Sequence, residues 1–145
     1  LSEGPSYHPA IRRRIEMGRF IPAVAYATAQ RMRALYAERM AKVFERYDVL
    51  AMPTVVVTAQ RIGEVMTEVG GRPLPAGTAG NIQVRMTQPF NVNGAPAVSV
   101  PAGFSGGGLP IGLQIAGKPW DDALVLGVAN AYQQATEWHT RWPDL

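Results

Sequence analysis

The chain has 145 residues, of which 47% are hydrophobic and 17% charged, so one globular domain is expected and a disordered or fibrous chain is excluded. It contains no cysteine, which excludes a disulfide framework, a thiolate nucleophile and a cysteine-ligated metal site. The formal net charge is only +3, and the one basic cluster, Arg12 to Arg14, lacks interleaved aromatic residues, so direct nucleic-acid binding is not expected.

The N-terminal segment is polar and carries no apolar stretch of the kind found in signal peptides. No run of about 18 apolar residues, the length needed to span a membrane, occurs elsewhere in the sequence. Together with the lack of cysteine, these features predict a cytoplasmic protein with no membrane contact. The first residue is Leu1 rather than methionine, which leads us to expect a reading frame that begins further upstream.

Two helices are predicted next. Ile11 to Met17 forms a short helix, and Gly18 ends it because glycine accepts the left-handed conformation common after a helix. A long helix follows, roughly from Pro22 to Arg46, with an apolar stripe that we expect to pack against the rest of the domain. The residues of the stripe recur at three- and four-residue steps: Met32, Leu35, Tyr36, Met40, Val43, Phe44 and Tyr47.

A buried strand and a long loop come after the helices. Asp48 to Thr58 is almost continuously apolar, and we expect the strand to end at Met52 because Pro53 interrupts the run. Gln60 to Arg85 contains five glycines and two prolines without a sustained period. It is predicted as a lid or binding loop, with at most a helical turn at Gly63 to Val69.

The C-terminal part predicts a β-hairpin followed by a helix. Two strands, Ala97 to Pro101 and Leu109 to Gly117, flank a glycine-rich turn at Gly103 to Gly108. Asp121 or Asp122 then caps the last helix, which leads into an aromatic tail.

No complete catalytic unit is predicted within the chain, because a nucleophile needs a neighbouring base and donors for the oxyanion. The available serines and lysines are few: Ser2, Ser6, Ser99, Ser105, Lys42 and Lys118. The glycines after Ser105 join two strands rather than a strand and a helix, so they indicate a connecting turn and not a phosphate-binding loop. His8 and His139 are far apart in the sequence, so no metal site is expected either.

Three segments together resemble the C-terminal half of the amidase-signature family, in the same order and spacing: Tyr47 to Thr54, Thr87 to Gly103, and Gly108 to Thr136. Ile11 to Phe20 also resembles the arginine-rich helix that precedes the long helix in these proteins. The stretch from Phe90 to Pro119 is the most specific part of the match.

The resemblance implies an α/β fold, namely the α/β/α architecture of this family around a large, twisted, mixed sheet, incomplete in this chain. It also implies hydrolysis of a small carboxamide by a Ser, cis-Ser, Lys triad without metal or cofactor. In the family this triad lies upstream, in a region resembling GGSSGGS, and no such segment occurs in this sequence. Residues 1–145 are therefore expected to be the C-terminal portion of an amidase domain, inactive alone, whose partner is the missing N-terminal portion.

Incompleteness also follows from the strands, because near-continuous apolar runs need neighbours on both edges and cover on both faces. Three predicted strands cannot provide this cover. We therefore expect the isolated chain to expose apolar surface and to aggregate or fold poorly. A homodimer is a further possibility.

Two subclasses of the family differ at identifiable positions. Arg14 matches an arginine that holds the substrate carboxylate in glutamine-using amidotransferase A subunits, a role suited to a bidentate guanidinium. These subunits carry an aspartate three residues before the threonine matched by Thr87, but here that residue is Val84. An apolar side chain cannot pair with the glutamine ammonium, so a stand-alone amidase is favoured. The alternatives are the A subunit of a tRNA-dependent amidotransferase and a non-catalytic interaction module.

Overall fold

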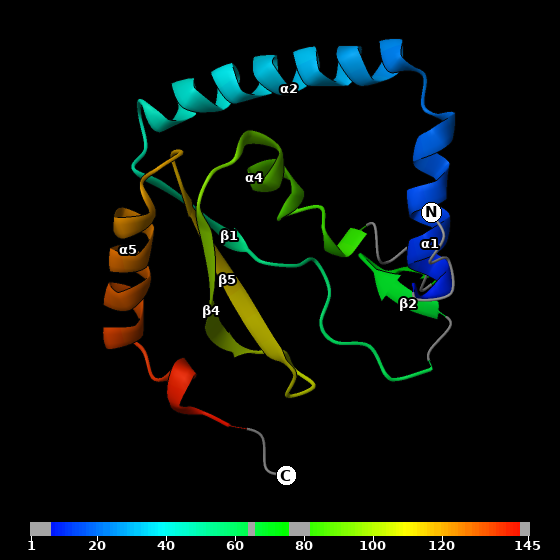
Figure 1. The fold of residues 1–145 in the computed structure, drawn as a ribbon. Helices are drawn as coiled ribbons and strands as arrows, with labels where there is room; N and C mark the ends of the chain where they lie inside the picture. The colour runs from blue at the N-terminus through cyan, green and yellow to red at the C-terminus, as the bar shows by residue number, and fades with distance from the viewer. Residues whose placement is uncertain (1–6, 64–65, 76–81, 143–145) are drawn as a thin grey trace. The chain divides into compact units, whose positions relative to one another are not determined.

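A computed structural model of the chain describes residues 7–63, 66–75 and 82–142 (Figure 1). The chain divides into two compact units, Leu1–Tyr36 and Ala37–Leu145. The described residues form helices and antiparallel strands, so the predicted α/β class is confirmed. Within the described part, no helix has both the length and the apolar character needed to cross a bilayer.

The first unit is helical. Helix α1 spans Pro9–Met17, and a 3₁₀ turn, η2, follows at Gly18–Phe20. Gly18 thus ends the helix as predicted, but it does so without the left-handed conformation that we expected, because the chain tightens into the 3₁₀ turn.

Helix α2, Ala23–Phe44, begins in the first unit and extends into the second. The long helix is therefore confirmed, within two residues at each end. The packing of its apolar stripe is not observed, since none of its residues is buried and Met32 is 59% exposed.

A three-stranded sheet forms the centre of the second unit. Its strands are β1 (Val49–Pro53), β4 (Ala97–Phe104) and β5 (Pro110–Gly117), in the order β1-β5-β4 with antiparallel neighbours throughout. The central strand β5 thus has the neighbours on both edges that its apolar sequence predicted. β1 lies at an edge of the sheet, and none of its residues is fully buried, contrary to our expectation of a buried strand. Proline is tolerated as its last residue, Pro53, because an edge strand does not need every backbone N–H to donate to a neighbouring strand.

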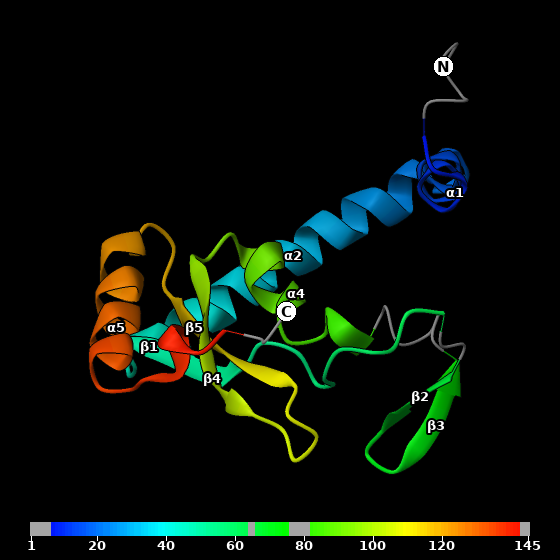
Figure 2. The same cartoon turned by 90° about the horizontal axis from the view of Figure 1, so that it is seen from below.

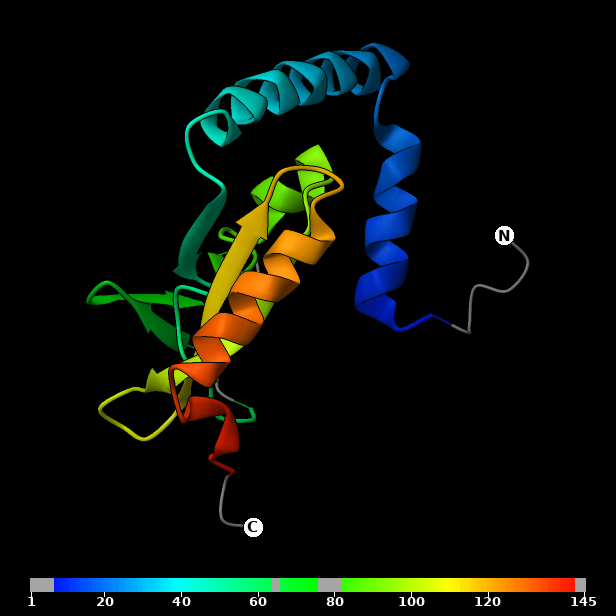
Figure 3. The ribbon, with the colours of Figure 1, turned by 90° about the vertical axis from the view of Figure 1, so that its left-hand side faces the viewer.

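Helix α5, Asp122–Gln134, covers one face of this sheet (Figure 3). The core between them consists of Val100, Ile115, Val125 and Ala129, all at most 6% exposed. Gly117 allows this close approach, because a Cβ there would lie 2.6 Å from Cγ2 of Val125. The predicted helix is confirmed, with Asp121 at its N-cap position, although the Asp121 side chain makes no capping hydrogen bond.

The predicted long loop contains a β-hairpin, which Figure 2 shows as a two-stranded sheet of its own, apart from the three-stranded sheet. Its strands are β2 (Met66–Val69) and β3 (Arg72–Pro75), so the helical turn expected at Gly63 to Val69 is wrong for Met66–Val69, while residues 64–65 lie outside the described residues. The cause is the turn between them: Gly70 and Gly71 both have positive φ angles, as a two-residue type I′ hairpin turn requires.

The sequence did not predict helix α4, Gln88–Asn93, which ends at Gly94 in the left-handed conformation. It has Pro89 in its first turn and only six residues, too few for a helical period to show. Its Phe90 is 4% exposed.

Candidate functional site

An open hollow of about 330 Å³ lies on the face of the sheet opposite to α5. We call it the sheet-face hollow. The end of β1, the α4 region and strands β4 and β5 all contribute to it. Its lining residues are Thr54, Thr87, Phe90, Asn91, Ala95, Ala97, Val98, Ser99 and Gln114.

The alternation of side chains along the strands explains this polar surface. On β5, Leu113 and Ile115 point to the α5 core, so Gly112 and Gln114 belong to the opposite face. Ser99 lies directly across from Gln114 in the β4–β5 ladder and shares that face. Each of the three strand regions thus contributes a polar or small residue to one surface.

Two hydroxyl groups meet at one end of the hollow. Oγ1 of Thr54 and Oγ of Ser99 are 2.6 Å apart, which is a strong hydrogen bond between residues 45 positions apart in the chain. They meet across the central strand at Gly112. A Cβ at that position would lie 2.8 Å from both oxygens, so the pair can form only because residue 112 is glycine.

Gln114 attaches the opposite wall of the hollow to the sheet. Its side chain is 3% exposed, and its Nε2 donates a hydrogen bond of 3.0 Å to the backbone oxygen of Met86. This bond holds the turn just before α4, and with it Thr87 and Asn91, against the sheet. Gln114 therefore positions the lining residues, and its amide nitrogen donates a hydrogen bond within the protein.

Val84 lies in the turn that precedes α4. The amide of Gln88 and the hydroxyl of Thr87 both donate to the backbone oxygen of Val84, at 2.8 and 3.2 Å. Val84 thus lies in the turn before α4, three residues before Thr87, which lines the hollow. Val84 itself is 47% exposed and is not one of the lining residues.

The sheet-face hollow has no ionisable side chain in its described lining. The clear pKa shifts occur elsewhere: the hydrogen bond from Arg12 lowers the pKa of Glu16, and partial burial raises the pKa of Tyr36. Across the described ranges, no group of three His, Asp or Glu residues gathers as metal ligands would. The lining thus offers hydrogen bonds and apolar contacts rather than acid–base groups.

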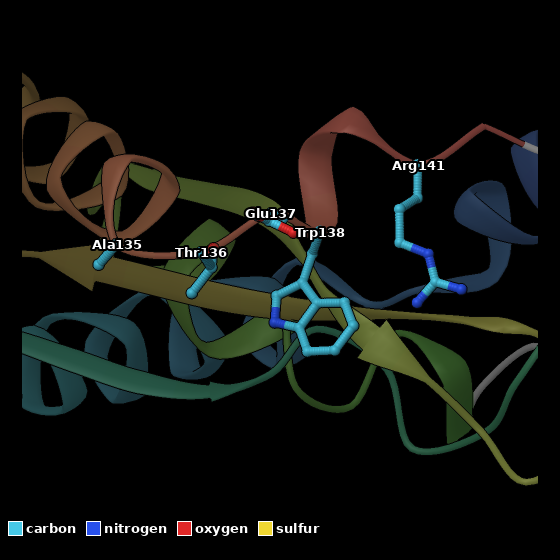
Figure 4. Close-up of a pocket in the computed structure, with 5 residues that line it drawn as sticks. All are labelled: Ala135, Thr136, Glu137, Trp138 and Arg141. Atoms are coloured by element: carbon cyan, nitrogen blue, oxygen red, sulfur yellow. The ribbon is translucent and has the colours of Figure 1, made fainter.

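A second hollow, of about 590 Å³, lies between the end of α5 and the 3₁₀ turn η3, Trp138–Thr140, and Figure 4 shows its lining. The guanidinium of Arg141 lies 4.5 Å from the ring centre of Phe104, and the Phe104 and Trp138 rings meet edge to face at 6.4 Å. This geometry is typical of aromatic and cation–π packing, here at the end of β4. We therefore take the sheet-face hollow as the candidate site.

The structure places the residues that the sequence singled out as follows. Arg14 is exposed in the last turn of α1, in the first unit, and its proposed contact with a substrate carboxylate stays a prediction. Ser105 has the expected turn role, since its Oγ accepts a hydrogen bond from the amide of Leu109. Gly108 has a positive φ angle in the connecting turn, as predicted, whereas Gly103, also with a positive φ, lies inside β4 at a shift in the strand register. Ser2 and Ser6 lie outside the described residues.

Sequence reasoning did not single out Thr54, Asn91 or Gln114, and it considered Ser99 as one of the few serines available as a nucleophile. One signal was present, because Gln114 is the only polar side chain in the strand PIGLQIAG. A buried amide in a central strand costs free energy unless it forms a hydrogen bond, so a partner for Gln114 could have been expected. The hydroxyl pair depends on strand register and left no local signal.

The Amidase family profile matches residues 3–126, and the chain belongs to this family. It is 40% identical over 149 aligned positions to the A subunit of a glutamyl-tRNA(Gln) amidotransferase from Chloroflexus aggregans, covering 99% of this chain and 29% of that protein.

Solved structures of other proteins have a similar fold. One, of a vestigial protein complex described as revealing the origins of an s-triazine catabolic enzyme, has a TM-score of 0.79 at 26% identity and covers 97% of this chain and 30% of that one. Another, of a 6-aminohexanoate cyclic dimer hydrolase, has a TM-score of 0.70 at 34% identity, covering 90% of this chain and 28% of that one. The chain thus spans somewhat less than a third of the length of these relatives.

Proposed function

We propose that this chain is the C-terminal portion of an amidase that hydrolyses a small carboxamide to a carboxylate and ammonia or an amine. The reaction passes through an acyl-enzyme on a Ser, cis-Ser, Lys triad that residues 1–145 do not contain, and it uses no metal or cofactor. The chain itself supplies sheet strands and one wall of the substrate pocket. On this proposal it is inactive alone.

The observation that carries the proposal is the sheet-face hollow in a member of the Amidase family. Its polar groups are hydroxyls and amides, of which Ser99 and Gln114 lie on strands, and strands hold hydrogen-bonding groups more rigidly than loops do. An uncharged carboxamide is both a donor and an acceptor of hydrogen bonds, and such a surface matches it. Ionisable groups for the chemical step would come from outside the chain.

Val84 supports a stand-alone amidase over a glutamine-using one. It lies in the turn just before α4, three residues before Thr87, at the position where the glutamine-using subunits have an aspartate to pair with the ammonium group. Valine would leave that ammonium without a partner, which is costly in a desolvated pocket. The 34% identity to a cyclic-dimer hydrolase is in line with this preference.

The second candidate is the A subunit of a tRNA-dependent amidotransferase. The 40% identity to the Chloroflexus aggregans protein favours it, and Arg14 would then hold the substrate carboxylate. A candidate of another class is a non-catalytic interaction module that keeps the scaffold of the family. The partners that we propose are the N-terminal portion of the same enzyme and, in a homodimer, a second copy of it, in the cytoplasm.

Ammonia release by the complete product of the gene that encodes this chain tests the proposal. We expect hydrolysis of simple neutral amides at a higher kcat/KM than of glutamine, without further protein partners. Glutamine hydrolysis that depends on such partners and on mischarged tRNA would favour the amidotransferase instead. A gene product that begins at this chain, folds stably and hydrolyses no amide would favour the interaction module.

A further inference from the structure

The hydroxyl pair of Thr54 and Ser99 has unused hydrogen-bonding capacity. Each hydroxyl has one proton to donate and two lone pairs to accept, and the bond between them uses one proton and one lone pair. Across the described part of the chain, neither side chain makes another hydrogen bond. The pair therefore has one spare donor and three spare acceptor positions, and the donor can be on either oxygen because the bond can run in either direction.

The surroundings of the pair limit what it could bind. Phe90, Ala95 and Ala97 supply apolar wall, and Asn91 adds one exposed amide. On the wall that this chain supplies, a charged group would find no opposite charge among the described lining residues. The surface suits a short apolar stem that ends in an uncharged group with both a donor and an acceptor.

Gly112 shows that the pair depends on a specific sequence choice. Glycine weakens the interior of a strand, because it loses more backbone entropy on folding than other residues do and has no side chain to pack. Here a side chain would push the two hydroxyls out of their positions, since its Cβ would lie 2.8 Å from each oxygen. The central strand thus accepts a destabilising residue where it leaves room for the pair.

We propose that Thr54 and Ser99 form a substrate-binding subsite that hydrogen-bonds a second, uncharged polar group of the amide substrate, away from the bond that is cleaved. This inference rests on the proposed amidase function and adds a specificity-determining pair to it. Gln114 acts as a positioning residue, because it holds the facing wall through Met86. The subsite favours substrates that carry a polar end group over isosteric apolar ones.

Two isosteric substrates test this subsite in the complete gene product. Succinamide ends in a second carboxamide, whereas 4-methylpentanamide has an isopropyl group of the same shape there. We expect the parent enzyme to prefer succinamide in kcat/KM. Ser99→Ala should lower that preference about fivefold, the value of one net hydrogen bond, mainly through KM for succinamide. Ser99→Thr should keep part of the preference, because it keeps the hydroxyl.

Matched controls separate binding from folding. Ser105→Ala removes a hydroxyl from the β4–β5 turn, and Gly106→Ala adds a methyl group where no atom lies within 4 Å, so both should leave the substrate preference unchanged. Gly112→Ala should lower the preference as Ser99→Ala does. A purely structural role of the pair would reduce activity on both substrates equally, and that result would overturn the proposal.

Direct binding distinguishes this inference from the proposed function. If the gene product hydrolyses neither amide, the proposed function fails, and calorimetric titration with succinamide still tests the subsite. Binding to the parent protein that weakens about fivefold in Ser99→Ala would support the subsite without the reaction. Equal binding to both proteins, or none to the parent, would overturn it.

Discussion

The two faces of the three-stranded sheet use alternate residues of the same strands, yet they differ in what they contact. On one face Val100 and Ile115 are sealed by α5. On the other, Ser99 and Gln114 line an open hollow next to Thr54. A single strand such as β4 thus contributes side chains to the apolar core and to the polar surface, because successive side chains point to opposite faces of the sheet.

This difference assigns separate roles to the two faces. The α5 face buries apolar side chains and should determine the stability of the second unit. The hollow face carries hydrogen-bonding groups and should determine what the protein binds. Substitutions on the α5 face should therefore change unfolding, and those on the hollow face should change ligand preference or local order.

The largest expected effect comes from the α5 face. Ile115→Ala removes a side chain that is 2% exposed and pairs with Ala51 and Val98 across both neighbouring strands. It should lower the free energy of unfolding by about 2–5 kcal/mol, because a cavity adds to the lost burial. Urea unfolding of the complete gene product measures this.

Ile111→Ala is the matched control on the same strand, where the side chain is 38% exposed. It should cost about 1 kcal/mol or less. Equal losses in the two variants would show that α5 does not make the core, and the contrast between the faces would fail.

The elements of the sheet and their order along the chain could be predicted from the sequence, because the strands are apolar and turn residues bound them. The role of each face could not. IGLQIA reads as a strand that is buried on both sides, and only the register places Gly112 and Gln114 on the open face. The Thr54–Ser99 contact joins the residue that follows β1 to a residue of β4, and these two strands are not adjacent in the sheet, so no local pattern could reveal it.

Short elements set a second limit. The β2–β3 hairpin depends on two consecutive glycines with positive φ, which a search for hydrophobic periodicity does not detect. Helix α4 is stabilised by Phe90 and by the Gln114 bond to Met86 rather than by its own propensity. Local turn geometry therefore determines the β2–β3 hairpin, which the sequence analysis misassigned. Tertiary contacts determine helix α4, which it missed.

An intermediate effect should come from Gln114→Leu, which has nearly the same size but cannot donate to the Met86 oxygen. Losing this bond should cost about 1 kcal/mol, and the loss should be local to the wall of the hollow. Hydrogen exchange should show faster exchange for amides of α4 and little change in α5.

Gln134→Leu, at the exposed end of α5, is the control and should leave exchange in α4 unchanged. If Gln114→Leu speeds exchange equally in α4 and α5, the two faces are coupled and cannot be assigned separate roles.

The smallest expected effect tests how far the α5 face extends. Beyond the helix, Arg141 stacks on Phe104 at 4.5 Å and lies 5.9 Å from the ring centre of Trp138, at the end of β4. Arg141→Ala should lower the free energy of unfolding by about 0.5–1 kcal/mol, the value of an exposed cation–π contact. Arg141→Lys, which keeps the charge, should lose less. A substrate preference altered by Arg141→Ala would instead show that this end of the sheet belongs to the binding surface, because stacking that only stabilises the fold should leave discrimination at the sheet-face hollow intact.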